Sequence, residues 1–342
     1  MLYFSKLRIA LVTLVTLFFV VIASSNFQDT ESSIISKKIN LGLDLQGGSY
    51  LLLEIDNGPV EVQKLQNTTT VVRNFLKDKK VVFTDLRIED KAIFFNISKQ
   101  DIDKVKVFFL DKESKINPYY NQYKSHQFDL LIKENEFKLT LSKYGLIEIK
   151  TSSQDQAIEI VRRRVDEVGT NEPNILKRGN NRILVELPGL DDPMRIKSLL
   201  GKTANLTFRF VTQNNNDTFG AETLKFEDGD DEALVSKRII LNGENLLDAQ
   251  PQMNNQTNET VVSFTLDRVG AKRFGKATRS GIGKQLAIVL DGKIVSAPVI
   301  RDAILTGSGQ ISGNFTFQSA TDLALLLRSG ALPAPLNIIE ER

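Results

Sequence analysis

An uncharged, largely apolar run lies close to the start of the chain. Residues 9–23 contain no charged side chain, and Lys6 and Arg8 precede them. A helix that crosses a bilayer needs about 20 apolar residues, whereas the core of a signal peptide needs about 7–15. The run therefore fits either an uncleaved membrane anchor or a signal peptide cleaved near Ala23 and Ser25. In both cases the basic flank stays in the cytoplasm and the rest of the chain lies outside it.

Apolar and polar positions alternate in residues 40–56, which predicts a β-strand interrupted by the glycine pair at 47–48. Residues 57–149 combine a helical spacing of apolar side chains with short alternating runs. Three threonines at 68–70, which are poor helix formers, lie in the middle of that helical spacing. We therefore predict a small α+β insertion in residues 57–149.

A clearer pattern follows in residues 150–212. One of the two serines at 152–153 can cap a helix whose apolar stripe ends at Gly169. Two strands around a Gly-Asn-Asn turn come next, and the Asp-Asp-Pro sequence at 191–193 marks the start of a second helix. A further strand at 204–212 completes the segment.

Together with the strand at 40–56, these elements follow the order β-α-β-β-α-β. That order is the ferredoxin-like pattern, here with a large insertion between its first strand and its first helix. A polar loop rich in Asn and Asp then leads into a second α+β unit in residues 213–315. In this unit Asp267 is an N-cap candidate, and Asp291-Gly292 between two apolar runs predicts a β-hairpin. A last amphipathic helix ends at Gly330.

Composition limits the chemistry that the chain can perform. It has 342 residues, 44 basic and 42 acidic side chains, no cysteine and one histidine, His126. A net charge of +2 lacks the basic excess of a nucleic-acid-binding protein. The missing cysteines exclude disulfides, thiol nucleophiles and cysteine-ligated metals, and a single histidine leaves little for a zinc site or a serine triad. We interpret His126 as exposed or satisfied by a local hydrogen bond.

Two glycine-containing stretches fail as phosphate-binding loops. The pair at 47–48 is followed by a strand rather than by a helix N-terminus, so a bend or a close backbone contact is the better interpretation. Gly283-Lys284 suggests a P-loop, but Thr278 stands at the position of its first glycine and Gln285 replaces the Ser or Thr that would reach magnesium.

Charged clusters also have structural interpretations. Helical spacing places Arg162 and Arg163 of the triple-arginine run 162–164 near Asp166, Glu159 and Glu167, which predicts a solvated, internally paired face. The Asp191-Asp192 pair suits a helix cap. No nucleophilic, acid-base or metal site is evident. The residues therefore indicate an extracytoplasmic, two-part α+β protein that works by binding or by moving.

Five stretches resemble, in family order, the SecD/SecF family of bacterial protein-export subunits. The first is "LGLDLQGGSYLLLEID", which is similar to the family's Gly-Gly motif. The others are "AIEIVRRRVDEVGTNEP", "RILVELPGLDDPMRIKSLLGKTANLTFRF", "LAIVLDGKIVSAPVI" and "GNFTFQSATDLALLLRSGALPAPL". The resemblance covers residues 1–56 and about 150–342, and the 60–149 segment has no counterpart that we can anchor.

The resemblance implies a location in the bacterial inner membrane, an uncleaved first helix, a ferredoxin-like periplasmic base and a mobile head subdomain. It implies a SecD subunit that pairs with SecF, assists the SecYEG channel together with a YajC-type subunit, and uses the proton-motive force to draw unfolded secretory polypeptide into the periplasm. It implies no catalytic residue, cofactor, metal or nucleic-acid partner. The substrate-binding surface is expected in the head at 213–315, with hinges near Thr212 and Asn314.

The family has six transmembrane helices, and its proton-relay carboxylates lie in the later ones. Because one hydrophobic span is present here, we expect a fragment or a truncated gene. The expected division is an anchor in 1–24, a linker in 25–39, the first strand in 40–56, the insertion in 57–149, the rest of the base in 150–212, the head in 213–315, and a helix with the lead-in to a missing second transmembrane helix in 316–342. The motif residues expected to be structural are Gly42, Asp44, Gly47, Gly48, Asp291, Gly292, Pro298, Gly330, Pro333 and Pro335.

Two other classes of protein stay open. One is a periplasmic binding or scaffold protein, anchored or secreted, that is unrelated to export. The other is an anchored enzyme, which would require a polar pocket with perturbed carboxylates. A mature N-terminus near Asn26 would favour a cleaved signal peptide and count against the family resemblance.

Overall fold

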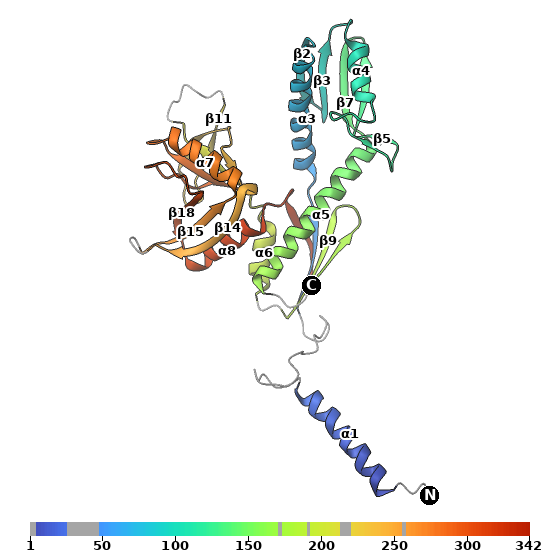
Figure 1. The fold of residues 1–342 in the computed structure, drawn as a ribbon, viewed down its shortest axis with the longest axis vertical. Helices are drawn as coiled ribbons and strands as arrows, with labels where there is room; N and C mark the ends of the chain where they lie inside the picture. Colours follow the sequence, from blue (N-terminus) through green and yellow to red (C-terminus); the bar gives the residue numbers. More distant parts are fainter. Residues whose placement is uncertain (1–4, 26–47, 170–172, 190–191, 213–219, 255–257) are drawn as a thin grey trace. The chain divides into compact units, whose positions relative to one another are not determined.

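The chain divides into two units, residues 1–47 and residues 48–342. The computed structural model describes residues 5–25, 48–169, 173–189, 192–212, 220–254 and 258–342 (Figure 1).

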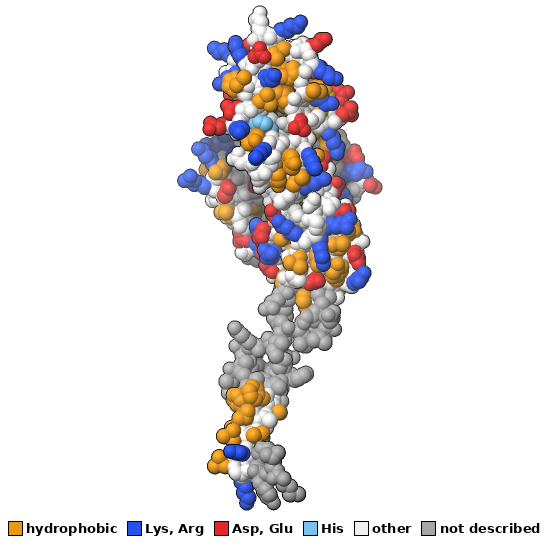
Figure 2. Space-filling model, turned by 90° about the vertical axis from the view of Figure 1, so that its right-hand side faces the viewer, with side chains coloured by type: hydrophobic (Ala, Val, Ile, Leu, Met, Phe, Trp, Pro, Cys, Tyr) orange, Lys and Arg blue, Asp and Glu red, His pale blue; other side chains and the backbone are white. Residues whose placement is uncertain are grey.

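The first unit contributes one described element, the 20-residue helix α1 (Lys6–Ser25). Between residues 7 and 21 the apolar side chains of this helix are exposed (Figure 2). Leu14 and Phe18 are among them. Across the described part of the chain, we find no helix that combines the length and the apolar character needed to cross a bilayer. Residues 26–39 of the expected linker, and the motif residues Gly42, Asp44 and Gly47, lie outside the described residues.

Four antiparallel strands of the second unit form a sheet in the order β19–β1–β9–β8. Along β1, side chains alternate between fully and partly buried, so that Leu51, Leu53 and Ile55 share the core face. Two helices, α5 and α6, pack against the sheet. We call this part the base lobe; its elements are β1 (Gly48–Ile55), α5 (Lys143–Val168), β8 (Asn174–Arg178), β9 (Arg182–Pro188), α6 (Pro193–Gly201) and β19 (Leu336–Glu341).

The fourth strand of this sheet differs from the sequence expectation. The strand predicted at 204–212 is β10 (Leu206–Phe210), but it pairs with β16 (Leu286–Leu290) in another sheet. The edge beside β1 is taken by β19, from the segment expected to lead into a second transmembrane helix. The apolar pattern of β10 fits any buried sheet, and β19 exposes most of its side chains, so neither pattern identifies its partner strand.

An insertion lobe lies between β1 and α5 in the sequence. Its sheet has the order β2–β3–β7–β6 and shares a separate core with two helices. The threonines at 68–70 do not interrupt the first helix, because Thr68 and Thr69 are buried and the Thr69 hydroxyl donates to the carbonyl of Leu65 at 2.8 Å. The elements of this lobe are α3 (Gly58–Asp78), β2 (Phe83–Glu89), β3 (Ala92–Ile97), α4 (Ile102–Leu110), β4 (Tyr119–Tyr120), β5 (Ser125–His126), β6 (Phe128–Lys133) and β7 (Glu136–Leu141).

Helix α5 begins earlier than the sequence suggested. Its N-cap is Ser142 rather than one of the serines at 152–153, and the Ser142 hydroxyl accepts a hydrogen bond from the backbone N–H of Gly145. A Cβ at position 145 would lie 2.2 Å from the carbonyl oxygen of Gln127, so a glycine is needed where the helix meets the insertion lobe. The predicted end at Gly169 is confirmed, with this glycine in the left-handed region.

The remaining strands and two helices form a head lobe, defined here as β10 through α8. Its largest sheet has the order β13–β10–β16–β17, a second has the order β14–β15–β18, and β11 pairs with β12. Helix α8 packs on β14 and β15. The further elements are β11 (Ala221–Lys225), β12 (Glu232–Ser236), β13 (Leu241–Asn242), the 3₁₀ turn η1 (Gly243–Asn245), β14 (Leu246–Met253), β15 (Thr260–Leu266), α7 (Arg268–Ser280), β17 (Lys293–Ser296), β18 (Ser308–Phe315) and α8 (Phe317–Ser329).

Two local predictions in the head lobe are confirmed. Asp267 caps α7, because its carboxylate accepts a hydrogen bond from the backbone N–H of Gly270. Asp291 and Gly292 form the turn of the β16–β17 hairpin, both with positive φ, as a two-residue turn requires. These features depend on a few neighbouring residues, which is why the sequence was sufficient to find them.

Candidate functional site

The chain crosses between the base lobe and the head lobe twice. It leaves the base after α6 through residues 202–205 and returns after α8 through residues 330–335. The two crossings are joined directly, since the backbone N–H of Leu332 donates to the carbonyl of Thr203 at 2.8 Å. We call these two segments and the side chains that bind them the joint.

Arg164 of α5 is the central side chain of the joint. It is 1% exposed, and its guanidinium donates only to backbone carbonyls. One terminal nitrogen, Nη1, binds the carbonyls of Leu199, at 2.6 Å, and Lys202. The other, Nη2, binds those of Thr203 at 3.3 Å and Gly330 at 3.2 Å. One base-lobe arginine therefore holds both crossings at once.

The charge of Arg164 is held without a direct carboxylate partner among the described residues. Burial lowers its pKa to about 10, and the negative charge of Asp291 opposes that lowering. A pKa of about 10 still leaves the guanidinium charged at neutral pH. Four carbonyl dipoles replace the water that burial removes, although Nε has no partner among the described atoms. The joint therefore surrounds a permanent positive charge with backbone oxygens.

Asp291 binds the outward crossing from the head side. Its carboxylate accepts hydrogen bonds from the Thr203 hydroxyl and from the backbone N–H groups of Ala204, at 3.0 Å, and Asn205, at 2.8 Å. Ala204 has a positive φ of 59°, a conformation that costs a non-glycine residue free energy and needs support from its surroundings. The hairpin turn of the head thus fixes the same short segment that Arg164 fixes from the base.

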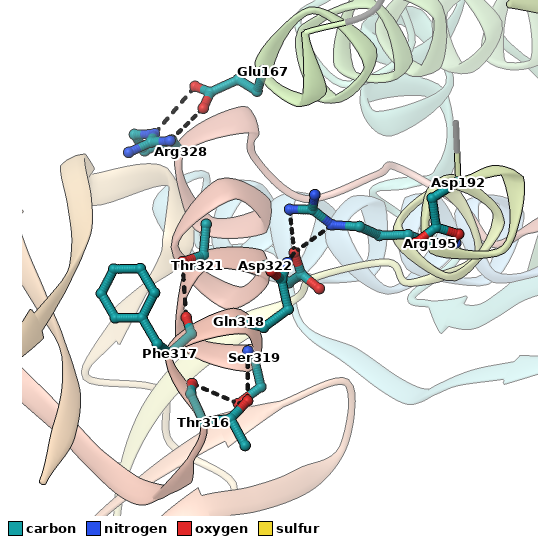
Figure 3. A network of polar contacts seen from close by, with 10 residues as sticks. All are labelled: Glu167, Asp192, Arg195, Thr316, Phe317, Gln318, Ser319, Thr321, Asp322 and Arg328. Atoms are coloured by element: carbon teal, nitrogen blue, oxygen red, sulfur yellow. Dashed lines mark hydrogen bonds and ion pairs between the residues drawn. The ribbon is translucent and has the colours of Figure 1, made fainter. Parts of the chain in front are cut away.

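Two further arginines connect α8 to the base lobe (Figure 3). Arg195 of α6 donates from Nε and Nη2 to one carboxylate oxygen of Asp322, at 3.0 and 2.8 Å. Arg328 of α8 binds the carboxylate of Glu167 in α5 and donates to the carbonyl of Ala249 at 3.0 Å. Partly exposed ion pairs of this kind contribute about 0–1 kcal/mol each. They orient α8 more than they stabilise the fold.

This arrangement corrects the interpretation of the triple-arginine run. Arg162 pairs with Glu159 at 2.9 Å, whereas Glu167 pairs outside its own helix with Arg328. Arg164 is buried, so the predicted solvated face is wrong for this residue. A signal was present in the sequence, because Arg164 lies three residues after Val161 and four before Val168, on the apolar stripe of the helix.

The Gly-Gly motif contributes one described residue, Gly48, at the start of β1. Its φ is +152°, and a Cβ there would lie 2.3 Å from the carbonyl oxygen of Leu187 in β9. Glycine is therefore required for β1 to reach its neighbour at this point. This geometry agrees with a close backbone contact rather than an anion-binding loop.

The other motif residues fall in two places. Asp291 and Gly330 belong to the joint, and the carbonyl of Pro335, on the return crossing, accepts from the backbone N–H of Asp56 at 3.0 Å. Pro333 lies on the same crossing. Gly292 and Pro298 lie in the head lobe, where the Pro298 carbonyl accepts from Leu286 N–H at 2.9 Å.

The described residues offer little for cofactor or metal chemistry. They contain no group of three or more His, Asp or Glu side chains placed to hold a metal ion. The single histidine, His126, is half-buried, and its Nδ1 lies 3.0 Å from the carbonyl oxygen of Asn117. The contacts of the joint suit a mechanical role, because they hold the two crossing segments together where the base lobe meets the head lobe.

The class of protein is therefore defined by an α+β architecture of three lobes, in which a doubly crossed joint connects the base lobe to the head lobe. Family models match three ranges: the SecD/SecF GG motif at residues 32–58, the N-terminal part of the P1 domain of protein translocase subunit SecDF at 154–213, and the SecDF P1 head subdomain at 221–334. The chain belongs to the SecD/SecF family. The three ranges leave residues 59–153, most of the insertion lobe, between them.

Related proteins match nearly the whole length of the chain. It is 37% identical over 350 residues to protein translocase subunit SecD of Rickettsia conorii and 37% identical over 349 residues to that of Acetobacter pasteurianus. These alignments cover 98% and 99% of this chain but 65% and 66% of the relatives, so the chain spans about two thirds of their length. The crystal structure of SecDF in its super-membrane-facing form matches with a TM-score of 0.54 and 25% identity, covering 96% of this chain and 35% of that one.

Proposed function

We propose that this chain assists protein translocation across the bacterial inner membrane by holding translocating polypeptide on a head lobe that moves about the joint. The observation that carries the proposal is the double crossing itself, where one buried arginine binds both connections between the lobes. Hydrogen bonds to backbone can be exchanged as the lobes rotate, while the chain stays connected. Membership of the SecD/SecF family supports the role in translocation.

The proposal includes a membrane anchor and a periplasmic location for the second unit. The exposed apolar side chains of α1, preceded by Lys6 and Arg8, support α1 as that anchor. We propose that the base lobe is ferredoxin-like, with β19 rather than β10 as its fourth strand. The order β19–β1–β9–β8 supports this, because each β-α-β half then encloses a strand of the other half.

The proposed partners are those of the family: SecF, the SecYEG channel, a YajC-type subunit and unfolded secretory polypeptide. Use of the proton-motive force is proposed for the full-length subunit, and the chain is proposed to act as an accessory subunit rather than as an enzyme. The hinges expected from the sequence, near Thr212 and Asn314, fall in hydrogen-bonded structure. The backbone N–H of Thr212 donates to the carbonyl of Leu234, and Asn314 lies within β18. The proposed hinges are now residues 202–205 and 330–335.

Site-specific photocrosslinking tests the proposal. A photoreactive residue is placed either at exposed positions of the head lobe or at exposed positions of the insertion lobe, and a secretory protein is stalled during export. We expect crosslinks from the head lobe. Crosslinks confined to the insertion lobe would contradict the assignment of the head as the holding surface, and no crosslink from either lobe would contradict the proposed function as a whole.

A further inference from the structure

The head lobe contains a cavity of about 430 Å³ between α7 and the segment that links β12 to β13. Its apolar side is formed by Phe210, Ile239 and Ile240, and three basic side chains, Arg238, Arg273 and Lys276, complete most of its wall. A cavity of this volume is in the range that binds small ligands or a few side chains of a peptide. Neither the residues of the joint nor the motif residues line it.

The charge of the cavity is one-sided. No Asp or Glu lines it, and none of its three cations forms an ion pair with any residue that the structure describes. Helix α7 adds to the same field, since residues 268–280 include five basic side chains and no acidic one. Asp267, the residue before α7, caps the helix by accepting from the N–H of Gly270, and its charge also acts on Arg273. The cavity therefore presents a positive field to an incoming group.

The apolar side of the cavity is already formed. Gly281 lets the Phe210 ring lie against the end of α7, because a Cβ at position 281 would be 2.6 Å from that ring. The Lys284 ammonium lies 5.8 Å from the centre of the same ring, which adds a cation to it. Ile239 is 48% exposed, so it offers apolar surface without any rearrangement. A ligand with both an acidic and an apolar part matches these two walls.

We propose that this cavity binds acidic segments of extended polypeptide in which a carboxylate side chain neighbours an apolar one. Arginine forks pair with carboxylates in a bidentate geometry, so Arg238 and Arg273 would receive the acidic side chain together with Lys276. The apolar neighbour would lie on Phe210 and Ile239. The hydroxyls of Ser236 and Ser280, which also line the cavity, suit the backbone of such a segment.

A recessed site favours a peptide over a lipid surface as the occupant. A membrane surface is met by side chains on a convex face, whereas these cations surround a hollow with an apolar wall. The inference rests on the proposed function, because it names the class of polypeptide that the head lobe would hold. It predicts that acidic, apolar-flanked stretches of a secretory protein are held more tightly than neutral ones, and that salt weakens the difference.

Fluorescence anisotropy with the whole chain in detergent tests the inference. The probes are two rhodamine-labelled ten-residue peptides, one alternating Asp with Leu and the other alternating Asn with Leu. We expect the Asp peptide to bind at least about tenfold more tightly, as charged hydrogen bonds allow. The double variant Arg273→Glu, Lys276→Glu should remove this preference. The double variant Arg268→Glu, Lys272→Glu is the matched control, since it changes the charge by the same amount at exposed residues of the same helix that do not line the cavity.

The apolar wall has its own matched pair. Ile239→Ser should weaken binding of the Asp peptide several-fold, whereas Ile282→Ser, at a residue of similar exposure outside the cavity, should leave it unchanged. Equal affinity for the two peptides, or equal effects of the cavity double variant and of the control Arg268→Glu, Lys272→Glu, would overturn the inference. So would binding to vesicles with anionic lipid in the absence of peptide binding. If crosslinks from the head lobe persist in the variant Arg273→Glu, Lys276→Glu, the proposed function is retained but this cavity is rejected as the binding site.

Discussion

At the scale of single residues, Arg164 shows how a charge can serve as a connector. A buried cation usually has a carboxylate partner, and here the partners are backbone carbonyls from two separate stretches of the chain, residues 199–203 and Gly330. Because a guanidinium has five donors in a rigid plane, one side chain reaches all of them. A lysine at this position would have a single nitrogen and could not bridge the same acceptors.

Replacing Arg164 should therefore destabilise the lobe connection strongly. Arg164→Met leaves four carbonyls without their donor, and we expect a loss of about 3 kcal/mol in the free energy of unfolding. Urea denaturation measures the loss. Arg163→Met is the control, because Arg163 is the exposed neighbour on the same helix and should change stability by less than about 0.5 kcal/mol. Similar losses in the two variants would show that the carbonyl contacts of Arg164 contribute little.

Sequence reasoning at this scale succeeded where the cause is local. The cap at Asp267 and the turn at Asp291 require only the residues beside them. It failed for Arg164, because the charge pattern of the run 162–164 suggested solvent, while the acceptors lie 35 or more positions away in the chain. The turn sequence also could not predict that the Asp291 carboxylate accepts hydrogen bonds from residues 203–205.

At the scale of elements, α7 offers a pH-dependent test. The backbone N–H of Gly270 is the main reason that the pKa of Asp267 lies below its ordinary value of 3.8. A carboxyl with a lowered pKa in the folded state contributes stability above its unfolded pKa and loses it as pH falls through the folded value. The contribution of Asp267 is thus complete at neutral pH and is lost in acid.

Asp267→Asn keeps an oxygen acceptor at the cap but removes the titration. The difference in unfolding free energy between the original protein and this variant should shrink as the pH is lowered between about pH 5 and pH 2. Thermal unfolding across that range measures it. A difference that stays constant with pH would mean that ionisation of Asp267 does not support α7.

The sequence predicted most of the helices and strands, but the observed ends of an element differ from the predicted ones where the element contacts another lobe. Helix α5 starts at Lys143 because its first turn is seated on the insertion lobe, with Gly145 against the carbonyl of Gln127. The sequence had instead predicted a start at the serine pair about ten residues later. The threonines at 68–70 lowered the expectation of a helix, yet the helix is continuous there. Their burial against a core outweighs their low helix propensity.

At the scale of the whole molecule, the two arginine bridges of α8 connect the head lobe to the base lobe. Since partly exposed bridges add little free energy, removing them should change motion more than stability. We expect Arg195→Ala with Arg328→Ala to lower the unfolding free energy by less than about 2 kcal/mol while broadening the distribution of distances between the lobes.

Single-molecule energy transfer can measure that distribution cleanly. The chain contains no cysteine, so dyes attached at Lys177→Cys in the base lobe and Lys237→Cys in the head lobe are the only labels. The double variant Arg268→Ala, Arg279→Ala removes two arginines from α7 and should leave the distribution unchanged. An unchanged distribution in the α8 variant as well would mean that the joint alone restrains the lobes.

The position of β19 has a consequence for how the chain is made. The partner of β1 along one edge, β19, begins at Leu336, so residues 48–55 must wait for nearly 290 later residues before their sheet is complete. Closing so long a loop is entropically costly unless the intervening chain is already compact. During synthesis the head lobe, which has its own core, would therefore become ordered first and bring the ends of the base together. Pairing of β19 with β1 would then depend on a folded head lobe, and a head lobe that misfolds would leave this edge of β1 without its partner strand.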